Sequence, residues 1–226
     1  MNIDPKSLRK PYKKRRFYIP EEIEQHNKAY DCWVSFFHEV FDISELIQAN
    51  VGSSYLGNPR TQPLIRAAGS DISHWFDKAT GDPRTFIDPT SNLETVYCPW
   101  GAYLDIQDPM PGSSAPALPW WKRKKEYCIG KLTRKARKIR IINMLTRDED
   151  CITVASEETL QEIQDRLERV NSNSGVYTWK RLSRPLDMEL TLEENGILDE
   201  SSEFLKYNID GEFYIPAIHI YFNDIS

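Results

Sequence analysis

The side chains best suited to metal or redox chemistry in this 226-residue sequence are four cysteines and four histidines. They are Cys32, Cys98, Cys128, Cys151, His26, His38, His74 and His219. No two cysteines form a Cys-x-x-Cys pair, and no histidine lies beside them at the spacing that tetrahedral zinc sites use. Scattered thiols of this kind are most often small buried apolar side chains. We therefore expect neither a structural zinc site nor a disulfide.

Motifs for phosphate binding and acid–base catalysis are incomplete. Gly130-Lys131 matches the end of a phosphate-binding loop, but Lys125 stands where that loop requires glycine and Leu132 where it requires a hydroxyl. The adjacent carboxylates Glu193-Glu194 are expected on a turn and would point apart, so they do not form a catalytic pair. These observations favour a protein that is not an enzyme.

Charge is unevenly distributed, although the net charge is only −5. Seven basic residues and no acid lie between residues 6 and 16, and ten basic residues against one acid lie between residues 122 and 140. Residues 187–226 carry ten acids and only one lysine. Three interpretations stay open: the basic segments dock on an acidic partner, fold onto the chain's own acidic end, or are solvated loops.

The sequence also argues against export and membrane insertion. No apolar run approaches the ~18 residues of a membrane-spanning helix. The N-terminal residues are polar and basic, without the apolar stretch of a secretory signal. We expect a cytoplasmic protein without membrane contact.

A Pro-rich stretch marks the clearest boundary. Residues 108–119, DPMPGSSAPALP, contain four prolines, which exclude a helix or a central strand. We expect four parts: a basic N-terminal arm, a first domain, a Pro-rich linker and a second domain. Their bounds are 1–16, 17–107, 108–121 and 122–226.

In the first half, short elements predict an α+β domain. Pro20 opens a short helix that reaches His26. Aromatic and β-branched residues at 32–43 predict a hairpin, and Ser44 caps the helix that follows. Asp71 caps a turn that places three apolar side chains on one side: Ile72, Trp75 and Phe76.

The second half predicts a hairpin, a helix and further strands. Apolar side chains mark strands at 139–144 and 152–154, with a charged turn at 147–150. Ser156 caps a helix in which apolar residues recur every three or four positions, and alternation at 177–179 and 218–222 indicates two more strands. This order is typical of a β-grasp domain.

Two sequence patterns resemble known domain families. Trp33-Val34, the run at 40–44 and Ala68-Gly69-Ser70-Asp71-Ile72 resemble the W-V…V-Y-D-V-T and A-G-x-D-A-T motifs of cytochrome b5 domains. The run at 191–197, TLEENGI, resembles the turn after the third strand of ubiquitin-type domains. The fold that these resemblances imply is α+β, with an N-terminal cytochrome b5-like domain joined by the Pro-rich linker to a C-terminal ubiquitin-like β-grasp domain.

The two domains in this order resemble a family of proteins of ciliary and flagellar axonemes that associate with radial spokes. The matching stretches lie at 72–77, 139–143, 177–180, 192–197 and 221–224. The resemblance implies a structural or regulatory component that supports ciliary motility by protein–protein docking. The alternatives are a haem-binding electron carrier or redox sensor acting in cilia, and an adaptor that binds ubiquitin receptors.

The cytochrome b5 resemblance implies haem b, held between two axial side chains. Tyr55, in a Tyr-x-Gly-Asn context, matches the position of the first ligand, and Phe86, before Ile-Asp-Pro, matches the second. A phenyl ring has no lone pair, so Phe86 cannot bind iron, and His74 is an alternative ligand if its helix points inward. We expect haem binding to be lost or weak. In the opposite interpretation Tyr55 is a loop aromatic, Phe86 fills the vacated space and His74 is an ordinary surface or core histidine.

A final cluster combines aromatic and basic side chains next to the Pro-rich stretch. It consists of Trp120, Trp121, Lys122, Arg123, Lys124 and Lys125. Such residues could stack on single-stranded nucleic acid or anchor a protein interface, and the overall acidity favours the protein. Alternatively, both tryptophans close the linker onto the core of the second domain. We expect radial spoke and other axonemal proteins as partners, and no nucleic acid.

Overall fold

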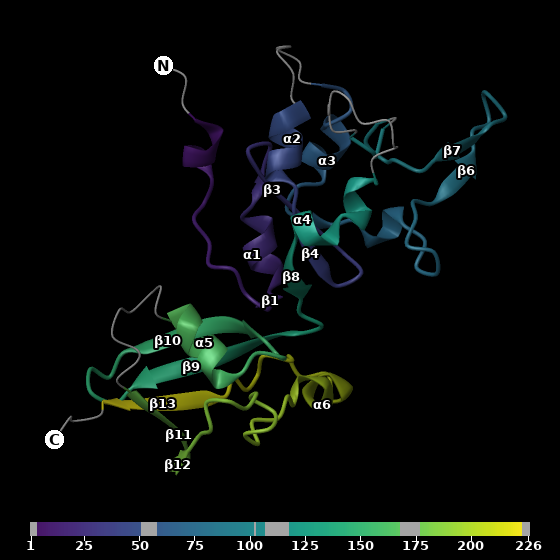
Figure 1. Cartoon of the computed structure of the whole chain (residues 1–226). Coiled ribbons are helices and arrows are strands. Elements are labelled where there is room, and N and C mark those ends of the chain that lie inside the picture. The colour runs from purple at the N-terminus through teal and green to yellow at the C-terminus, as the bar shows by residue number, and fades with distance from the viewer. Residues whose placement is uncertain (1–3, 51–57, 102, 107–117, 168–176, 223–226) are drawn as a thin grey trace. The chain divides into compact units, whose positions relative to one another are not determined.

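Three clusters of buried apolar side chains form the described cores, two before residue 133 and one after it. The computed structural model describes residues 4–50, 58–101, 103–106, 118–167 and 177–222. The chain forms two compact units, Met1–Leu132 and Thr133–Ser226, and each combines helices with a sheet (Figure 1). The predicted α+β class is therefore confirmed.

A six-stranded sheet is the frame of the first unit. Its order is β1-β8-β4-β3-β2, and β5 also pairs with β3. β3 and β4 form the antiparallel hairpin predicted at residues 32–43, with Phe37 and His38 at positive φ in the turn. The strands are β1 (Phe17–Tyr18), β2 (Asn27–Lys28), β3 (Asp31–Phe36), β4 (Glu39–Asp42), β5 (Ser70–Asp71) and β8 (Cys128–Leu132).

Short helices complete the first unit. They are η1 (Pro5–Leu8), α1 (Pro20–Glu24), α2 (Ser44–Asn50), α3 (Gln62–Arg66), η2 (Ser73–Trp75), η3 (Trp120–Lys122) and α4 (Lys124–Tyr127). As predicted, Asp71 accepts the backbone N–H of Ser73, and Ile72, Trp75 and Phe76 are all buried. The predicted cap by Ser44 is replaced by another contact. The Asp42 carboxylate accepts the backbone N–H of Ser44 at the start of α2, while the Ser44 hydroxyl accepts the N–H of Cys32.

The predicted boundary between the domains is wrong. Leu104 and Ile106 before the Pro-rich stretch and Trp120 and Trp121 after it are buried in the same core, and β8 then pairs with β4 and β1. The stretch therefore joins two parts of the first unit, which ends at Leu132 and not at residue 107. Prolines predict where helices and strands are interrupted, but they do not indicate which unit the chain joins after the interruption. Residues 107–117 themselves lie outside the described residues.

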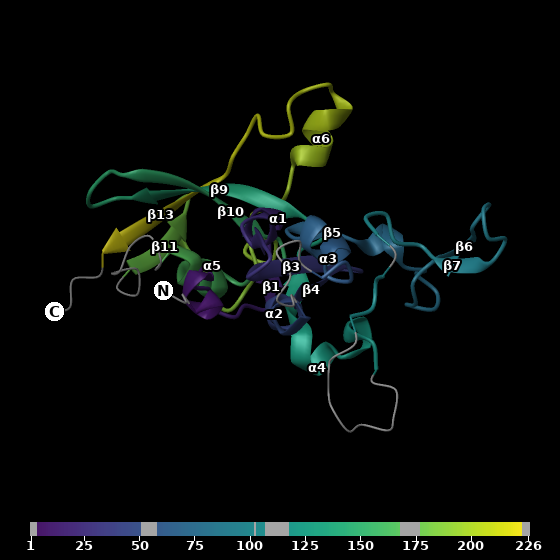
Figure 2. The same cartoon turned by 90° about the horizontal axis from the view of Figure 1, so that it is seen from above.

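A separate hairpin, β6 (Thr85–Ile87) and β7 (Glu94–Val96), belongs to the first unit but not to its main sheet. The two strands are antiparallel, with Phe86 opposite Thr95. Figures 1 and 2 show the hairpin projecting away from α2, α3 and the sheet. Its strand residues are all exposed, so it adds nothing to the core.

The second unit contains a mixed five-stranded sheet of order β10-β9-β13-β11-β12. β9 and β10 form a hairpin, and the last strand, β13, lies parallel to β9 at the centre. The four longer strands confirm the strands predicted near 139–144, 152–154, 177–179 and 218–222. The strands are β9 (Ala136–Asn143), β10 (Glu149–Ala155), β11 (Tyr177–Arg181), β12 (Arg184–Pro185) and β13 (Ala217–Phe222).

The predicted helix of the second unit is α5 (Leu160–Leu167), with α6 (Ser201–Lys206) as an additional short helix. Leu160, Ile163 and Leu167 are buried, which confirms the apolar stripe. The predicted cap is wrong: Thr159 and Glu162 form a reciprocal capping box, whereas the Ser156 hydroxyl donates to the carbonyl of Lys135.

The run at 191–197 is a compact turn. The Glu194 carboxylate accepts the N–H and hydroxyl of Thr191, which lowers the pKa of that carboxyl through these hydrogen bonds. Leu192 and Ile197 on either side are buried in the core, and Gly196 has a φ of +76°. The motif therefore has a structural role, and Glu193-Glu194 is not a catalytic pair.

We predict that Trp120→Ala destabilises the first unit by about 3–5 kcal/mol, because it removes a fully buried indole. Hydrogen exchange along a urea series, read by mass spectrometry, should show lower protection in peptides from β3 and β4 and unchanged protection in β9 and β13. The half-exposed Trp100 provides the control, since Trp100→Ala should stay within about 0.5 kcal/mol of wild type. Unchanged protection of β3 and β4 would contradict the placement of Trp120.

Candidate functional site

The residue at the expected second haem-ligand position lies on the surface. Phe86 is in the middle of β6 with 45% of its area exposed, and its ring meets the edge of Tyr97 at 6.5 Å between centroids. The interpretation in which Phe86 fills a vacated pocket is therefore wrong, because the ring belongs to the projecting hairpin. Tyr55, at the first ligand position, lies outside the described residues.

His74 does not serve as the alternative ligand. It is exposed at the centre of η2, and its Nε2 accepts the indole N–H of the neighbouring Trp75 at 2.9 Å. Trp75 itself is fully buried, so the short helix directs the indole inward and the imidazole outward. His74 would be an alternative ligand only if its helix directed the imidazole inward, and the imidazole points outward.

The other described imidazoles of the first unit are also unsuited to a facing pair. His38 is exposed in the β3–β4 turn. His26 is buried, but its Nδ1 lies 2.7 Å from Asp31 Oδ1 and its ring stacks on Trp33 at 3.6 Å. Among the described residues, no group of three or more His, Cys, Asp and Glu side chains could hold a metal ion.

The buried thiol of the first unit is also a poor ligand. Cys32 is fully buried at the second position of β3, and this burial raises the pKa of its thiol above the ordinary value. A thiolate is the form that binds metals and attacks electrophiles, so Cys32 is suited to packing rather than chemistry.

Aromatic side chains fill the core of the first unit. Phe36 stacks on Phe41 at 4.5 Å and on Phe76 at 4.7 Å, and it meets the edge of Trp120 at 5.9 Å. The Trp120 indole donates to the carbonyl of Leu104 at 3.1 Å. Trp121 contacts Phe76 and is only 8% exposed. Both tryptophans therefore pack inside the first unit, and the prediction that they anchor a partner or the core of the second domain is wrong.

The basic residues after the tryptophans contact carboxylates of their own unit. Lys122 lies 2.5 Å from Asp82, and Lys124 lies 2.6 Å from Glu39. Arg123 pairs with Glu126 and lies over the Tyr127 ring. Exposed pairs of this kind contribute little stability, so a partner could replace them. Whether Lys122–Lys125 binds a partner remains a prediction.

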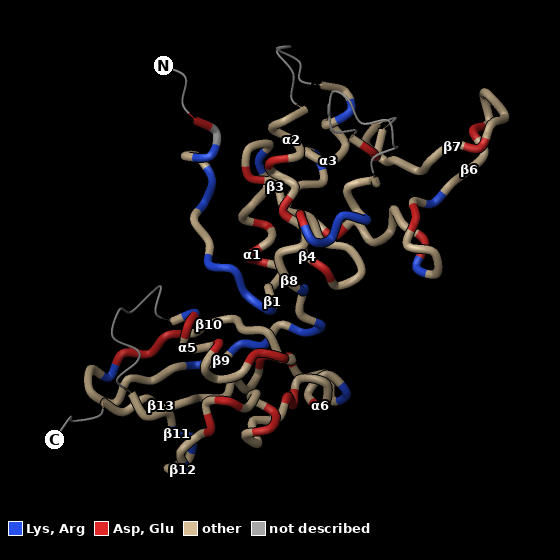
Figure 3. The backbone as a smooth tube through the Cα atoms, in the orientation of Figure 1, with Lys and Arg blue, Asp and Glu red and all other residues tan. Residues whose placement is uncertain are grey.

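The N-terminal arm folds back on carboxylates of the first unit instead of extending into solvent. Asp42, at the end of β4, accepts from the guanidinium of Arg9 and from the hydroxyl of Tyr12. The backbone N–H of Lys10 donates to Asp31, the residue that also contacts His26. Figure 3 shows this basic segment in blue along the unit. The alternative offered from the sequence was folding onto the acidic end at 187–226, whereas the arm contacts Asp42 and Asp31 of the first unit.

Burial of the arm also changes the acidity of Tyr12. Partial burial, followed by the negative charge of Asp42, raises the pKa of this phenol to about 12. Its ring packs edge-on against Trp33 at 4.5 Å and against His26 at 5.9 Å. Asp31, Asp42, His26 and Trp33 thus form a docking site for the arm, built from β3, β4 and the segment after α1.

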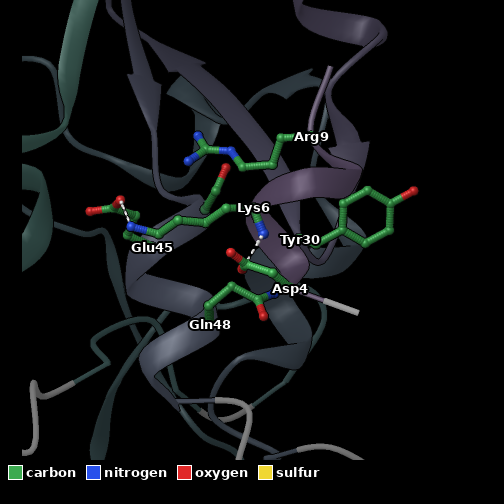
Figure 4. Close-up of a pocket in the computed structure, with 7 residues that line it drawn as sticks. Asp4, Lys6, Arg9, Tyr30, Glu45 and Gln48 are labelled. Carbon is green, nitrogen blue, oxygen red and sulfur yellow. Dashed lines mark hydrogen bonds and ion pairs between the residues drawn. The ribbon is translucent and has the colours of Figure 1, made fainter. Parts of the chain in front are cut away.

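A crevice of about 410 Å³ lies beside the docked arm (Figure 4). Lys6 pairs with Glu45 at 3.1 Å, and its backbone N–H donates to Asp4. The crevice contains opposite charges that already contact one another, and the described residues that line it include no thiol or imidazole. The crevice is therefore suited to holding the arm against α2 rather than to catalysis. The lining residues are Asp4, Lys6, Arg9, Tyr30, Ser44, Glu45 and Gln48.

Comparison with known proteins identifies the first unit. The family model of the cytochrome b5-like heme/steroid binding domain matches residues 20–133. A protein from Xenopus tropicalis named cytochrome b5 domain-containing protein 1 is 44% identical over 92% of this chain and 95% of its own length. The chain belongs to the cytochrome b5 domain family. Relatives of the same name are 41% identical in Homo sapiens, over 94% of this chain and 92% of theirs, and 39% identical in Mus musculus, over 93% and 91%.

Membership in the cytochrome b5 domain family agrees with the boundary that packing indicates. The family match ends at residue 133, one residue after β8, so it spans the Pro-rich stretch. The names of these relatives do not describe an enzyme. Haem is the cofactor that family resemblance implies. The described residues do not fit the two-sided ligation of haem iron, because Phe86 and His74 both face away from the core. No helix in the described parts of the chain is long and apolar enough to cross a membrane.

We predict that Arg9→Ala loosens the arm, because it leaves the half-buried Asp42 carboxylate without its guanidinium partner. Tryptic cleavage after Lys13 and Lys14 should become roughly tenfold faster, which corresponds to about 1.4 kcal/mol. Lys6→Ala is a matched control: it also removes one trypsin site, but its pair with Glu45 is exposed on both sides and contributes little. Equal acceleration by both variants would contradict a specific role of Asp42.

We also predict that Phe86→His does not create a bis-histidine haem site, because residue 86 lies on the exposed hairpin. Protein mixed with haemin should give the same visible spectrum for the variant and the wild type. The control is Thr95→His, which places an imidazole opposite residue 86 on β7. A sharp low-spin Soret band that is specific to Phe86→His would contradict the outward position of this residue.

Proposed function

We propose that the chain is a structural component of the ciliary axoneme, associated with radial spokes, and that it supports motility by docking rather than by chemistry. Its partners are radial spoke and other axonemal proteins, and it acts in the cytoplasm and the cilium. The resemblance of the paired domains to axonemal proteins supports this location. The packing of the first unit's core supports the non-catalytic part of the proposal.

The second unit is proposed to be a ubiquitin-like β-grasp domain. Its sheet has the chain order second, first, fifth, third, fourth, with the first and last strands parallel at the centre. α5 follows the first hairpin and contributes its apolar stripe to the core. The turn at 191–197 follows the third long strand, as the resemblance implies. A fold alone does not determine function, so the docking role of this unit is inferred from the resemblance to axonemal proteins.

The observation that carries the proposed function is the aromatic filling of the first unit. Haem needs an apolar cavity and axial ligands on both faces of the iron. Here Trp120, Phe36 and Phe76 pack against one another, while the two described candidates for ligands face solvent. This arrangement favours a scaffold over the haem-binding electron carrier or redox sensor, which is the alternative function.

We assign the principal docking surface of the first unit to the β6–β7 hairpin and the segment after it. Seven large apolar side chains between residues 86 and 103 are more than one third exposed, although the hairpin is regularly hydrogen-bonded. Such a concentration of exposed apolar side chains in one segment favours a protein interface. They are Phe86, Ile87, Leu93, Val96, Tyr97, Trp100 and Tyr103.

The test is retention of the protein in detergent-extracted axonemes of ciliated cells. The wild-type protein should remain with the axoneme. In the double variant Ile87→Ser with Leu93→Ser, the ratio of soluble to axoneme-bound protein should rise at least tenfold, as expected when central interface residues are lost. Leu182→Ser changes a leucine of the second unit that is even more exposed, and this variant should be retained.

Two results would overturn the proposal. Wild-type protein found entirely in the soluble fraction would exclude an axonemal component. Protein isolated from its source with stoichiometric haem that cycles between ferric and ferrous states would favour the electron carrier.

A further inference from the structure

A second exposed apolar surface lies in the second unit, outside its sheet. We call residues 198–214 the α6 lobe; it connects the turn at 191–197 to β13. Figures 1 and 2 show α6 standing beside the sheet rather than on its face. Six large apolar side chains of the lobe are exposed, and Tyr207 and Phe213 exceed 70%. They are Leu198, Leu205, Tyr207, Ile209, Phe213 and Tyr214.

The lobe is ordered by contacts of its own. α6 ends at Lys206, and the N–H of Ile209 donates back to the carbonyl of Phe204 at 3.0 Å. The rings of Phe204 and Phe213 meet at 5.9 Å, and the N–H of Phe213 donates to Asp210. Local hydrogen bonds therefore hold apolar side chains in water, which is unfavourable unless another surface covers them.

Ion pairs attach the lobe to the rest of the second unit at two points. Asp199 pairs with Lys135, and Glu212 pairs with Lys138 of β9 at 2.8 Å. These exposed pairs contribute little one by one, but the guanidinium of Arg137 also donates to the carbonyls of Ile197 and Leu198 at 2.9 Å and fixes the start of the lobe. The lobe thus presents a defined surface.

The charge of the lobe indicates the kind of partner. It contains five carboxylates and a single basic residue, Lys206, which already pairs with Glu203 at 2.6 Å. Glu200 and Asp210 are exposed beside the apolar side chains. Exposed carboxylates interspersed with exposed apolar side chains attract a partner in which Lys or Arg flanks apolar side chains.

We infer that the α6 lobe binds an amphipathic segment of a partner protein, in which an apolar face is flanked by Lys or Arg. Anionic membranes and nucleic acids are disfavoured, because their negative charge would meet the carboxylates. A second copy of the lobe would bring the same carboxylates together, and the arm of this chain uses Arg9 and Lys6 on Asp42 and Glu45. The inference does not rest on a ciliary location.

The experiment titrates the full-length protein with a synthetic 18-residue amphipathic helix of Leu and Lys, and with the same peptide carrying Glu in place of Lys. Amide NMR signals of residues 198–214 should shift with the Lys peptide only, and the affinity should fall with salt. Leu205→Ser with Tyr207→Ser should weaken binding at least tenfold, as expected for the centre of an interface. Leu182→Ser, on the β11–β12 turn, is the matched control and should bind normally.

A second variant distinguishes lost binding from an unfolded lobe, because the double serine variant could weaken binding in either way. Glu200→Gln removes only an exposed charge and should weaken binding of the Lys peptide about two- to fivefold at low salt. Binding unaffected by both lobe variants, or equal binding of the Glu peptide, would overturn the inference. Dimerisation of the protein that the Lys peptide inhibits would instead identify a second copy as the occupant and would equally overturn it.

Discussion

The closure of the first unit by its own distant C-terminal segment is the constraint on which the rest of that unit depends. Trp120 packs edge-on against the stacked rings of Phe36 and Phe41, and β8 then occupies the position between β4 and β1. Without this segment β4 would be an exposed edge and a fully buried indole would be missing. The unit therefore extends across the Pro-rich stretch to Leu132, as the family match also indicates.

The same packing explains why the described core of this member of the cytochrome b5 domain family does not fit two-sided ligation of haem iron. A fold supplies a framework, and its function depends on the side chains at a few positions. Here the described core is occupied by aromatic rings, and the one imidazole buried in the first unit's described residues, His26, is committed to Asp31 and Trp33. Its environment supports attachment of the arm, so a position that could carry chemistry serves packing instead.

Local patterns predicted the elements well, whereas contacts between distant residues could not be predicted. The hairpin at 32–43 and the stripe of α5 depend on periodicity within a few residues, and both are confirmed. Trp120 and Trp121 were misassigned because an aromatic pair next to lysines has the same composition in a core and in an interface. The arm's contact with Asp42 joins residues 33 positions apart, a distance at which no local pattern indicates pairing. The hairpin at 85–96 was missed, because its apolar side chains are exposed and so lack a buried face to set a period.

The late position of β8 also affects how the protein folds during synthesis. Domains generally fold as units while the ribosome proceeds from the N-terminus. The nascent first unit cannot complete its sheet until residue 132 has left the exit tunnel. About ninety further residues must therefore be synthesised after β4 while the edge of β4 has no partner strand. During that interval the nascent chain would be a substrate for chaperones that recognise apolar segments, and pausing of translation after residue 132 would favour correct assembly.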